Sequence, residues 1–108
     1  MKTQEIIYKI LEVLDEALDQ NNPDFSSIKH ENLGISKERW SYALEMMQDA
    51  GLIKGVVFVR GGNNRAPINS FIDNMNITLN GIMYLADNST SAKVYKAAKM
   101  LKDVIPGL

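Results

Sequence analysis

The stretch ISKERWSYALEMMQDAGLIKGVVFVR, residues 35–60, decides the fold. Ser36 is a favourable N-cap residue, and Gly51 supplies the left-handed residue on which helices commonly end. Between them, apolar residues recur at spacings of three and four, which predicts a helix with one buried stripe. The stripe consists of Trp40, Ala43, Leu44, Met47 and Ala50. After Gly55, the β-branched and aromatic run 56–59 predicts a strand. A helix that leads directly into a β-ribbon is typical of the second half of a winged helix-turn-helix.

The rest of the chain supplies the elements that such a fold needs. We expect a helix at 3–19, a short irregular helix within 24–34, a returning wing strand at 68–72, a helix at 79–86 capped by Thr78, and a final helix at 92–105. The side chains of the 79–86 helix that we expect to be buried are Leu79, Ile82, Met83 and Leu85. The sequence therefore predicts a single α+β domain over residues 1–108. In this domain a helical core carries a small antiparallel β-wing and an extra C-terminal helix at about 92–105.

Composition excludes several classes of protein. The chain has 108 residues, a net charge of -1, no cysteine and a single histidine, His30. Without cysteine there are no disulfides and no thiolate metal sites, and one histidine cannot form a multi-histidine site, so we expect no metal and no cofactor. No run approaches the roughly 20 apolar residues of a membrane span, and no secretory signal opens the chain. We expect a cytoplasmic protein.

Three stretches carry a resemblance to a known family. They are GLIKGVVFV at 51–59, ITLNGIMYL at 77–85 and KVYKAAKMLKDVIPG at 93–107. Together, and in this order, they resemble the YjcQ-like family of small proteins from bacteria and their prophages. The resemblance implies a winged-helix fold with an added C-terminal helix. It implies no enzyme activity and assigns no functional residues.

The fold invites a DNA-binding hypothesis. In winged helices the helix corresponding to residues 36–50 enters the major groove, and the wing contacts phosphates. The candidate contacts to double-stranded DNA are Lys37, Arg39, Ser41, Tyr42, Lys54, Arg60 and Arg65, and Gln48 is also favourable. The charge pattern opposes this hypothesis. Glu38, Glu45 and Asp49 point away from the apolar stripe and would repel a polyanion.

The alternative is a protein–protein adaptor that uses the winged-helix scaffold without binding DNA. Tyr42, Met46 and Tyr84 are candidate exposed contacts, and the C-terminal helix could pair with a second copy to form a homodimer. The four lysines of that helix fan around its polar side, which favours a solvated face over a phosphate-binding surface. They are Lys93, Lys96, Lys99 and Lys102.

Catalysis is the least supported class. The chain has no phosphate-binding loop, no HExxH and no GxSxG motif. We expect His30 to be an exposed side chain beside Lys29 and Glu31, because no residue is placed to form a catalytic relay with it. The sequence therefore predicts a non-catalytic protein. DNA-linked regulation is the leading hypothesis, and the adaptor is the alternative.

Overall fold

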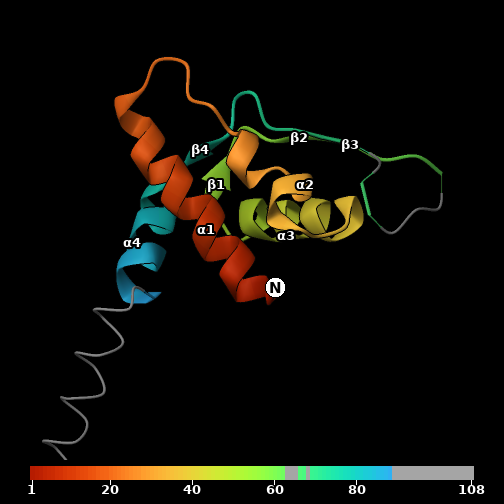
Figure 1. Ribbon diagram of the computed structural model, residues 1–108, viewed down its shortest axis with the longest axis horizontal. Coiled ribbons are helices and arrows are strands. Elements are labelled where there is room, and N and C mark those ends of the chain that lie inside the picture. The colour runs from red at the N-terminus through yellow and green to blue at the C-terminus, as the bar shows by residue number, and fades with distance from the viewer. Residues whose placement is uncertain (63–65, 68, 89–108) are drawn as a thin grey trace, which may run out of the picture.

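A computed structural model of the chain describes residues 1–62, 66–67 and 69–88. The fold is α+β (Figure 1). Its helices are α1 (Thr3–Glu16), η1 (Ala17–Asp19), η2 (Ser26–Ile28), α2 (His30–Leu33), α3 (Lys37–Asp49) and α4 (Leu79–Asn88). Its strands are β1 (Ile53–Lys54), β2 (Val57–Val59), β3 (Asn69–Phe71) and β4 (Asn76–Ile77). The predicted helix at 92–105 lies outside the described residues.

The first helix forms the centre of the core. Ile6, Ile10, Leu11 and Leu14 of α1 are at most 2% exposed, and their spacings of four, one and three residues place them on one face. This helix contacts both α3 and α4, which lie on different sides of it in Figure 1. The helix expected at 3–19 is therefore buried by more than one partner.

Trp40 joins the α2 region to α3. Its side chain is 5% exposed, and its indole Nε1 donates a hydrogen bond to the carbonyl of Ile28 at 2.8 Å. The single tryptophan therefore anchors the core, as the sequence predicts. Gly34 closes α2 at a φ of 70°, in the left-handed region. His30 differs from the prediction, because it is half-buried with its ring 5.9 Å from that of Trp40.

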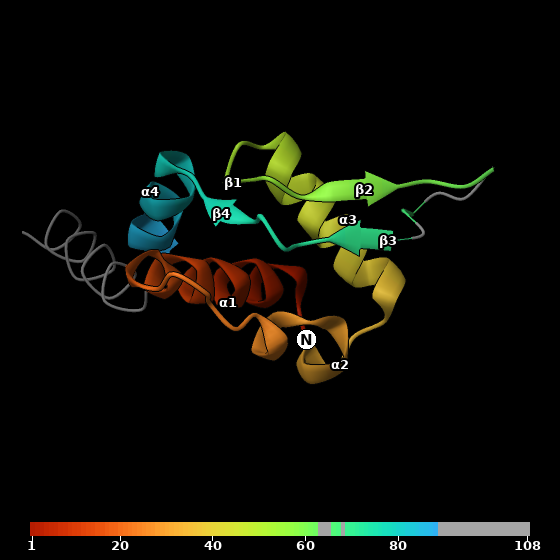
Figure 2. The same cartoon turned by 90° about the horizontal axis from the view of Figure 1, so that it is seen from above.

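The ends of α3 confirm the predicted caps. The Ser36 side chain accepts a hydrogen bond from the Arg39 backbone N–H at 3.1 Å. Gly51 follows the helix at a φ of 77°. The β-ribbon then leaves directly from the end of α3 (Figure 2).

The ribbon consists of two antiparallel ladders with an interruption between them. In the inner ladder, β1 pairs with β4, Ile53 opposite Ile77. In the outer ladder, β2 pairs with β3, Val57 opposite Phe71. Two residues join the ladders on the outgoing side, 55–56, whereas four join them on the return, 72–75. The extra residues bring the Asn74 carbonyl against Gly55, which has a φ of 87°.

The start of α4 is fastened to the end of α3. Thr78 Oγ1 donates to the carbonyl of Gly51 and accepts from the Gly81 N–H, so Thr78 caps the helix as predicted. Gly81 is buried, and a Cβ there would lie 2.2 Å from the Leu52 carbonyl oxygen. The prediction of buried Leu79 and Met83 is wrong, because these side chains are 73% and 55% exposed. The helix packs through its glycine face instead.

The order of helices followed by a β-ribbon is consistent with a winged helix. The ribbon runs alongside α3 and extends beyond it (Figures 1 and 2). Two surfaces of these elements are therefore open to a partner. They are the side of α3 opposite its buried stripe and the outer side of the ribbon.

Candidate interaction surface

One stripe of α3 faces the ribbon and holds it in place. Positions 37, 41, 45 and 48 are separated by four, four and three residues, so they lie on one side of the helix. Each of their side chains bonds to the outer ladder or to a residue that flanks it. The contacts are Lys37 Nζ to Asn69 Oδ1 at 2.8 Å, Ser70 Oγ to Ser41 Oγ at 2.9 Å, the ion pair of Arg60 with Glu45, and Gln48 with the backbone of Val56.

The Gln48 side chain forms the two backbone hydrogen bonds with Val56 that a neighbouring strand would otherwise form. Its Nε2 donates to the Val56 carbonyl at 3.1 Å, and its Oε1 accepts from the Val56 N–H at 2.9 Å. Val56 lies between the two ladders and is buried, so its backbone groups would otherwise lose their hydrogen bonds. Gln48, which the sequence favoured as a DNA contact, has a structural task here.

Three of the predicted DNA contacts form hydrogen bonds within the molecule. Lys37 is exposed but bonds to Asn69 on the ribbon. Arg39 donates from its guanidinium to Thr3 Oγ1 at 3.3 Å, at the start of α1. Ser41 is 0% exposed, which corrects its nomination as a contact, since no external partner can reach it without opening the fold.

The other predicted DNA contacts that the structure describes lie on different elements. Tyr42 is half-buried on α3, and Lys54 is exposed on β1. Arg60 is exposed, but its charge is paired with that of Glu45. Arg65 lies outside the described residues. Arg39 lies in the first turn of α3 and Lys54 follows the helix, so about 15 Å of helix lies between Arg39 and the helix end that leads to Lys54.

The outward side of α3 carries acidic and apolar side chains. Positions 38, 42, 46 and 49 follow one another along the helix at spacings of four and three. Glu38 and Asp49 are exposed near the two ends of this row, and Met46 is 50% exposed within it. We call these four residues, Glu38, Tyr42, Met46 and Asp49, the outer face of α3. The two carboxylates repel a polyanion and attract a basic protein surface, and exposed Met46 can contact an apolar one.

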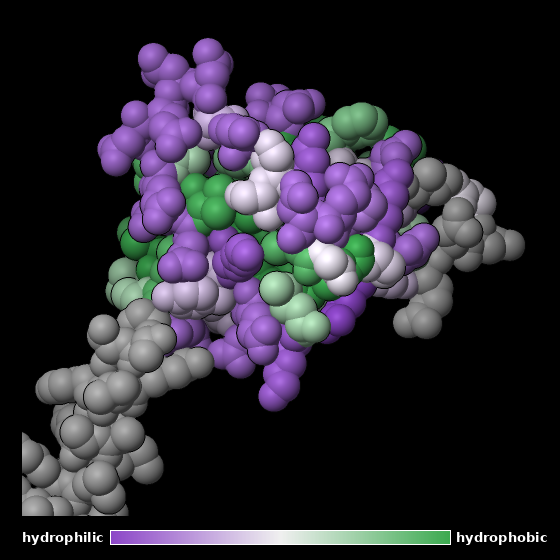
Figure 3. Space-filling model, viewed as in Figure 1, coloured by the Kyte–Doolittle hydropathy of each residue, from purple (hydrophilic) through white to green (hydrophobic). Residues whose placement is uncertain are grey.

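The outer side of the ribbon is apolar. Val57 and Phe71 are opposite one another and are 58% and 49% exposed, and Val59 is 43% exposed. Residues on a strand alternate between faces, so Phe58 points the other way and is half-buried against the core. We call Val57, Val59 and Phe71 the wing face. Apolar surface is visible along this edge of the molecule (Figure 3).

The sequence did not identify the wing face. The run 56–59 is apolar at every position, so its pattern contains no alternation that could tell the inner side from the outer side. An uninterrupted apolar run in a two-stranded ribbon was nevertheless a usable signal. Such a ribbon has helices on only one side, so half of the run has to be exposed.

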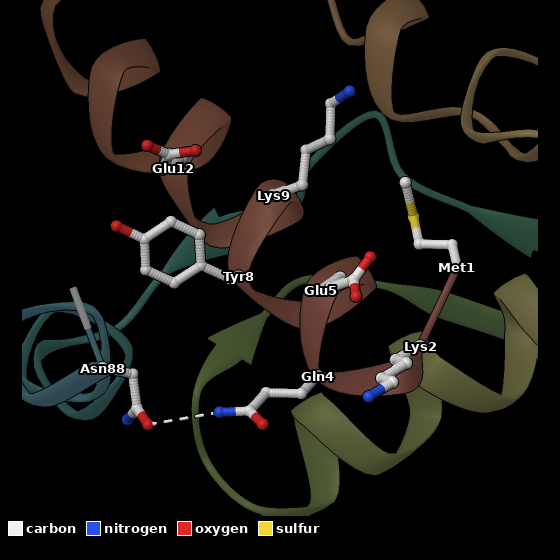
Figure 4. A pocket seen from close by; sticks show the side chains of 8 residues that line it. All are labelled: Met1, Lys2, Gln4, Glu5, Tyr8, Lys9, Glu12 and Asn88. Carbon is white, nitrogen blue, oxygen red and sulfur yellow. Dashed lines mark hydrogen bonds between the residues drawn. The ribbon is translucent and has the colours of Figure 1, made fainter. Parts of the chain in front are cut away.

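A hollow lies near the N-terminus, beside α1. It has a volume of 630 Å³ and is bordered by the exposed side of α1 and by Asn88 (Figure 4). Gln4 Nε2 donates to Asn88 Oδ1 across it at 3.5 Å. Lysine and glutamate side chains alternate around it in similar numbers. The described residues contain no cluster of three or more His, Cys, Asp or Glu that could hold a metal ion.

Two further polar sites have local roles. His30 Nε2 lies 3.1 Å from the carboxylate of Glu31. The hydroxyl and the backbone N–H of Ser26 both donate to Asp24 Oδ1, and these bonds hold the pKa of Asp24 below its ordinary value of 3.8. Among the described helices, none has both the length and the apolar composition required to cross a bilayer.

Comparison with known proteins identifies one relationship. A family model described as YjcQ protein matches residues 8–104, which is most of the chain. No significant match was found among the curated proteins or the solved structures.

Proposed function

The chain belongs to the YjcQ family, and from this premise we propose that it is a non-catalytic adaptor of bacterial or prophage origin that binds another protein. Its contact surface comprises the wing face and the outer face of α3. In winged-helix proteins that bind DNA, these elements approach the duplex. In this chain they present apolar and acidic side chains.

The observation that carries the proposal is that three of the cations expected to contact DNA already bond to other residues of the chain. The ammonium group of Lys37 and the guanidinium groups of Arg39 and Arg60 all bond within the molecule. At the dielectric of a protein surface, each carboxylate brought close to a phosphate costs on the order of 1 kcal/mol or more. The wing face instead offers Val57, Val59 and Phe71, which gain free energy when a protein partner removes them from water.

DNA-linked regulation is the competing function, and the arrangement of helix and ribbon supports it by analogy alone. Lys54 is the exposed cation that this hypothesis would use on the ribbon. The two hypotheses differ in their dependence on salt. Binding to phosphates weakens steeply as salt rises, whereas binding through apolar side chains does not.

A pair of variants separates the two functions. Val57→Asp with Phe71→Asp removes the wing face and leaves the cations intact, whereas Lys54→Gln with Arg60→Gln removes cations and leaves the wing face intact. Each is compared with the unaltered chain in two assays. One is fluorescence anisotropy with a random-sequence duplex at low salt, and the other is affinity capture from extract of the source organism. Lys9→Asp on α1 is the matched control for an added negative charge.

We expect no salt-dependent anisotropy change with the duplex. We expect a captured protein that the Lys9→Asp and Lys54→Gln/Arg60→Gln chains retain and the wing-face variant loses. The opposite pattern would overturn the adaptor in favour of DNA binding: an anisotropy rise at low salt that the wing-face variant keeps and the Lys54→Gln/Arg60→Gln variant loses. Circular dichroism confirms that each variant folds.

A further inference from the structure

The last described helix has an apolar side that no described residue covers. Leu79 and Met83 are one helical turn apart and are 73% and 55% exposed. Ile82 and Leu85 are half-buried and border a groove of 350 Å³ between α4 and α1. The apolar arc of α4 is therefore wider than its contact with α1, which indicates a second packing partner.

The other wall of the groove is acidic. It is formed by the α1 residues Tyr8, Glu12, Asp15 and Glu16, which lie on one side of that helix. Neither ion pair found among the described residues involves Glu12, Asp15 or Glu16. A groove with an apolar floor and an acidic wall fits an amphipathic helix that carries lysines.

The chain contains a segment of this chemistry immediately after α4. Residues 89–108 lie outside the described part, so only their sequence bears on the groove. Val94, Ala98, Leu101 and Ile105 are spaced by four, three and four residues, which predicts one apolar stripe on a helix. The other side of this segment carries four lysines, and Asp103 is its single acidic residue.

The length of the chain suits this occupant. Helical residues 92–105 would span about 21 Å, as the 14 residues of α1 do. The three residues 89–91 can bridge at most about 10 Å, which is close to the 8–10 Å between the axes of packed helices. A segment tethered this closely has a millimolar effective concentration at the groove, which favours it over a partner in free solution.

We propose that the groove between α1 and α4 is a docking site for residues 92–105 of the same chain. The apolar stripe of the segment packs against Ile82, Leu85 and Met83, and its flanking lysines lie beside the carboxylates of α1. This contact completes the core on the side of the molecule remote from the wing. It is independent of the adaptor function.

Cysteine cross-linking in the full chain tests this proposal, since the chain has no native cysteine. Ala86→Cys places a thiol in the groove, and Ala98→Cys places one on the apolar stripe. A short bis-maleimide then joins thiols that lie close together. The matched control replaces Ala86→Cys by Glu38→Cys in the first turn of α3, and α3 and α4 lie at different ends of α1 (Figure 2). Leu101→Ser disrupts the stripe, and Lys96→Gln alters the polar side.

We expect rapid formation of a cross-linked monomer in the 86/98 pair, at least tenfold faster than in the 38/98 pair. We expect Leu101→Ser to abolish this advantage and Lys96→Gln to preserve it. A cross-linked dimer would show that a second copy supplies the segment, which overturns docking within one chain. Equal rates for the two pairs would overturn occupancy of the groove altogether.

Discussion

At the scale of single residues, a few side chains and glycines fix the geometry on which everything else depends. Gly55 is one of them. It adopts a φ of 87°, and a Cβ there would lie 2.0 Å from the Asn74 carbonyl oxygen, a distance that real Cβ atoms do not show. Backbone atoms on both sides of the ribbon would have to move to accept any larger residue.

Gly55→Ala should therefore lower the free energy of unfolding by about 3 kcal/mol, because backbone strain and steric overlap add. Gly34→Ala is the matched control. Gly34 has a φ of 70° with no atom within 4 Å of the added Cβ, so only the strain of about 1 kcal/mol applies. Urea denaturation measures both. Equal losses in the two variants would show that the ribbon relaxes freely around Asn74.

Asp24 provides a prediction about pH. Hydrogen bonds from Ser26 stabilise the carboxylate and lower its pKa in the folded protein. A lowered pKa contributes stability that is complete above the unfolded value of 3.8 and is lost as the pH falls through the folded value. Ser26→Ala removes the hydroxyl bond, so the pKa of Asp24 should rise. Carboxyl carbon NMR during an acid titration measures this shift, and Ser27→Ala, one residue along, should leave the pKa unchanged.

At the scale of secondary structure, the helix and ribbon predicted from residues 35–60 are confirmed. Ser36 and Gly51 mark the ends of α3 through local chemistry, which a sequence displays directly. The pairing of β2 with β3 follows from two short extended runs around a glycine-rich turn. The inner ladder is not apparent from the sequence, because two residues per strand leave no periodic pattern to detect.

The orientation of α4 could not be predicted from its sequence. Its apolar residues cover a wide arc, and the pattern alone does not say which part of the arc meets the core. Gly81 determines which side of α4 meets the core, because the absence of a side chain lets the helix approach the Leu52 carbonyl. That glycine turns Leu79 and Met83 outwards. Likewise, the nomination of Ser41 as a contact failed because position 41 faces the ribbon, which depends on tertiary packing.

The attachment of the wing to α3 is a property of these two elements together and can be tested as such. Gln48→Leu should lower the free energy of unfolding by about 1–3 kcal/mol, since two backbone groups of buried Val56 lose their partners. The Val56 amide should then exchange its hydrogen faster with solvent. Met46→Leu, on the outer face of α3, is the control and should change neither quantity. Unchanged exchange in Gln48→Leu would mean that the Gln48 side chain does not protect the Val56 amide from solvent.

At the scale of the whole molecule, one core links the helices to the inner part of the ribbon. It contains residues from α1, α2, α3, β1 and β4, together with Val56, Ile72 and Met75 between the ladders. Trp40 lies within it and bonds to Ile28, so its fluorescence reports on the contact between distant parts of the chain.

Urea unfolding followed by Trp40 fluorescence should therefore coincide with unfolding followed by far-ultraviolet circular dichroism. A single core of this size unfolds in one cooperative step. The emission maximum should shift to longer wavelength as the indole, 5% exposed in the fold, enters water. A fluorescence transition that precedes the loss of helical signal would show that α3 separates from the core before α1 unfolds.

The interruption of the β-ribbon at Gly55 and Asn74 has a consequence for how such proteins diversify. The inner strands are part of the core through Ile53 and Ile77, whereas the outer strands are attached by the polar stripe of α3 and by Phe58. Mutations that lengthen or shorten the outer hairpin beyond Phe58, or that replace its exposed side chains, therefore leave the hydrophobic interior unchanged. Evolution can therefore change what the outer hairpin recognises while the helical core and the inner ladder stay the same.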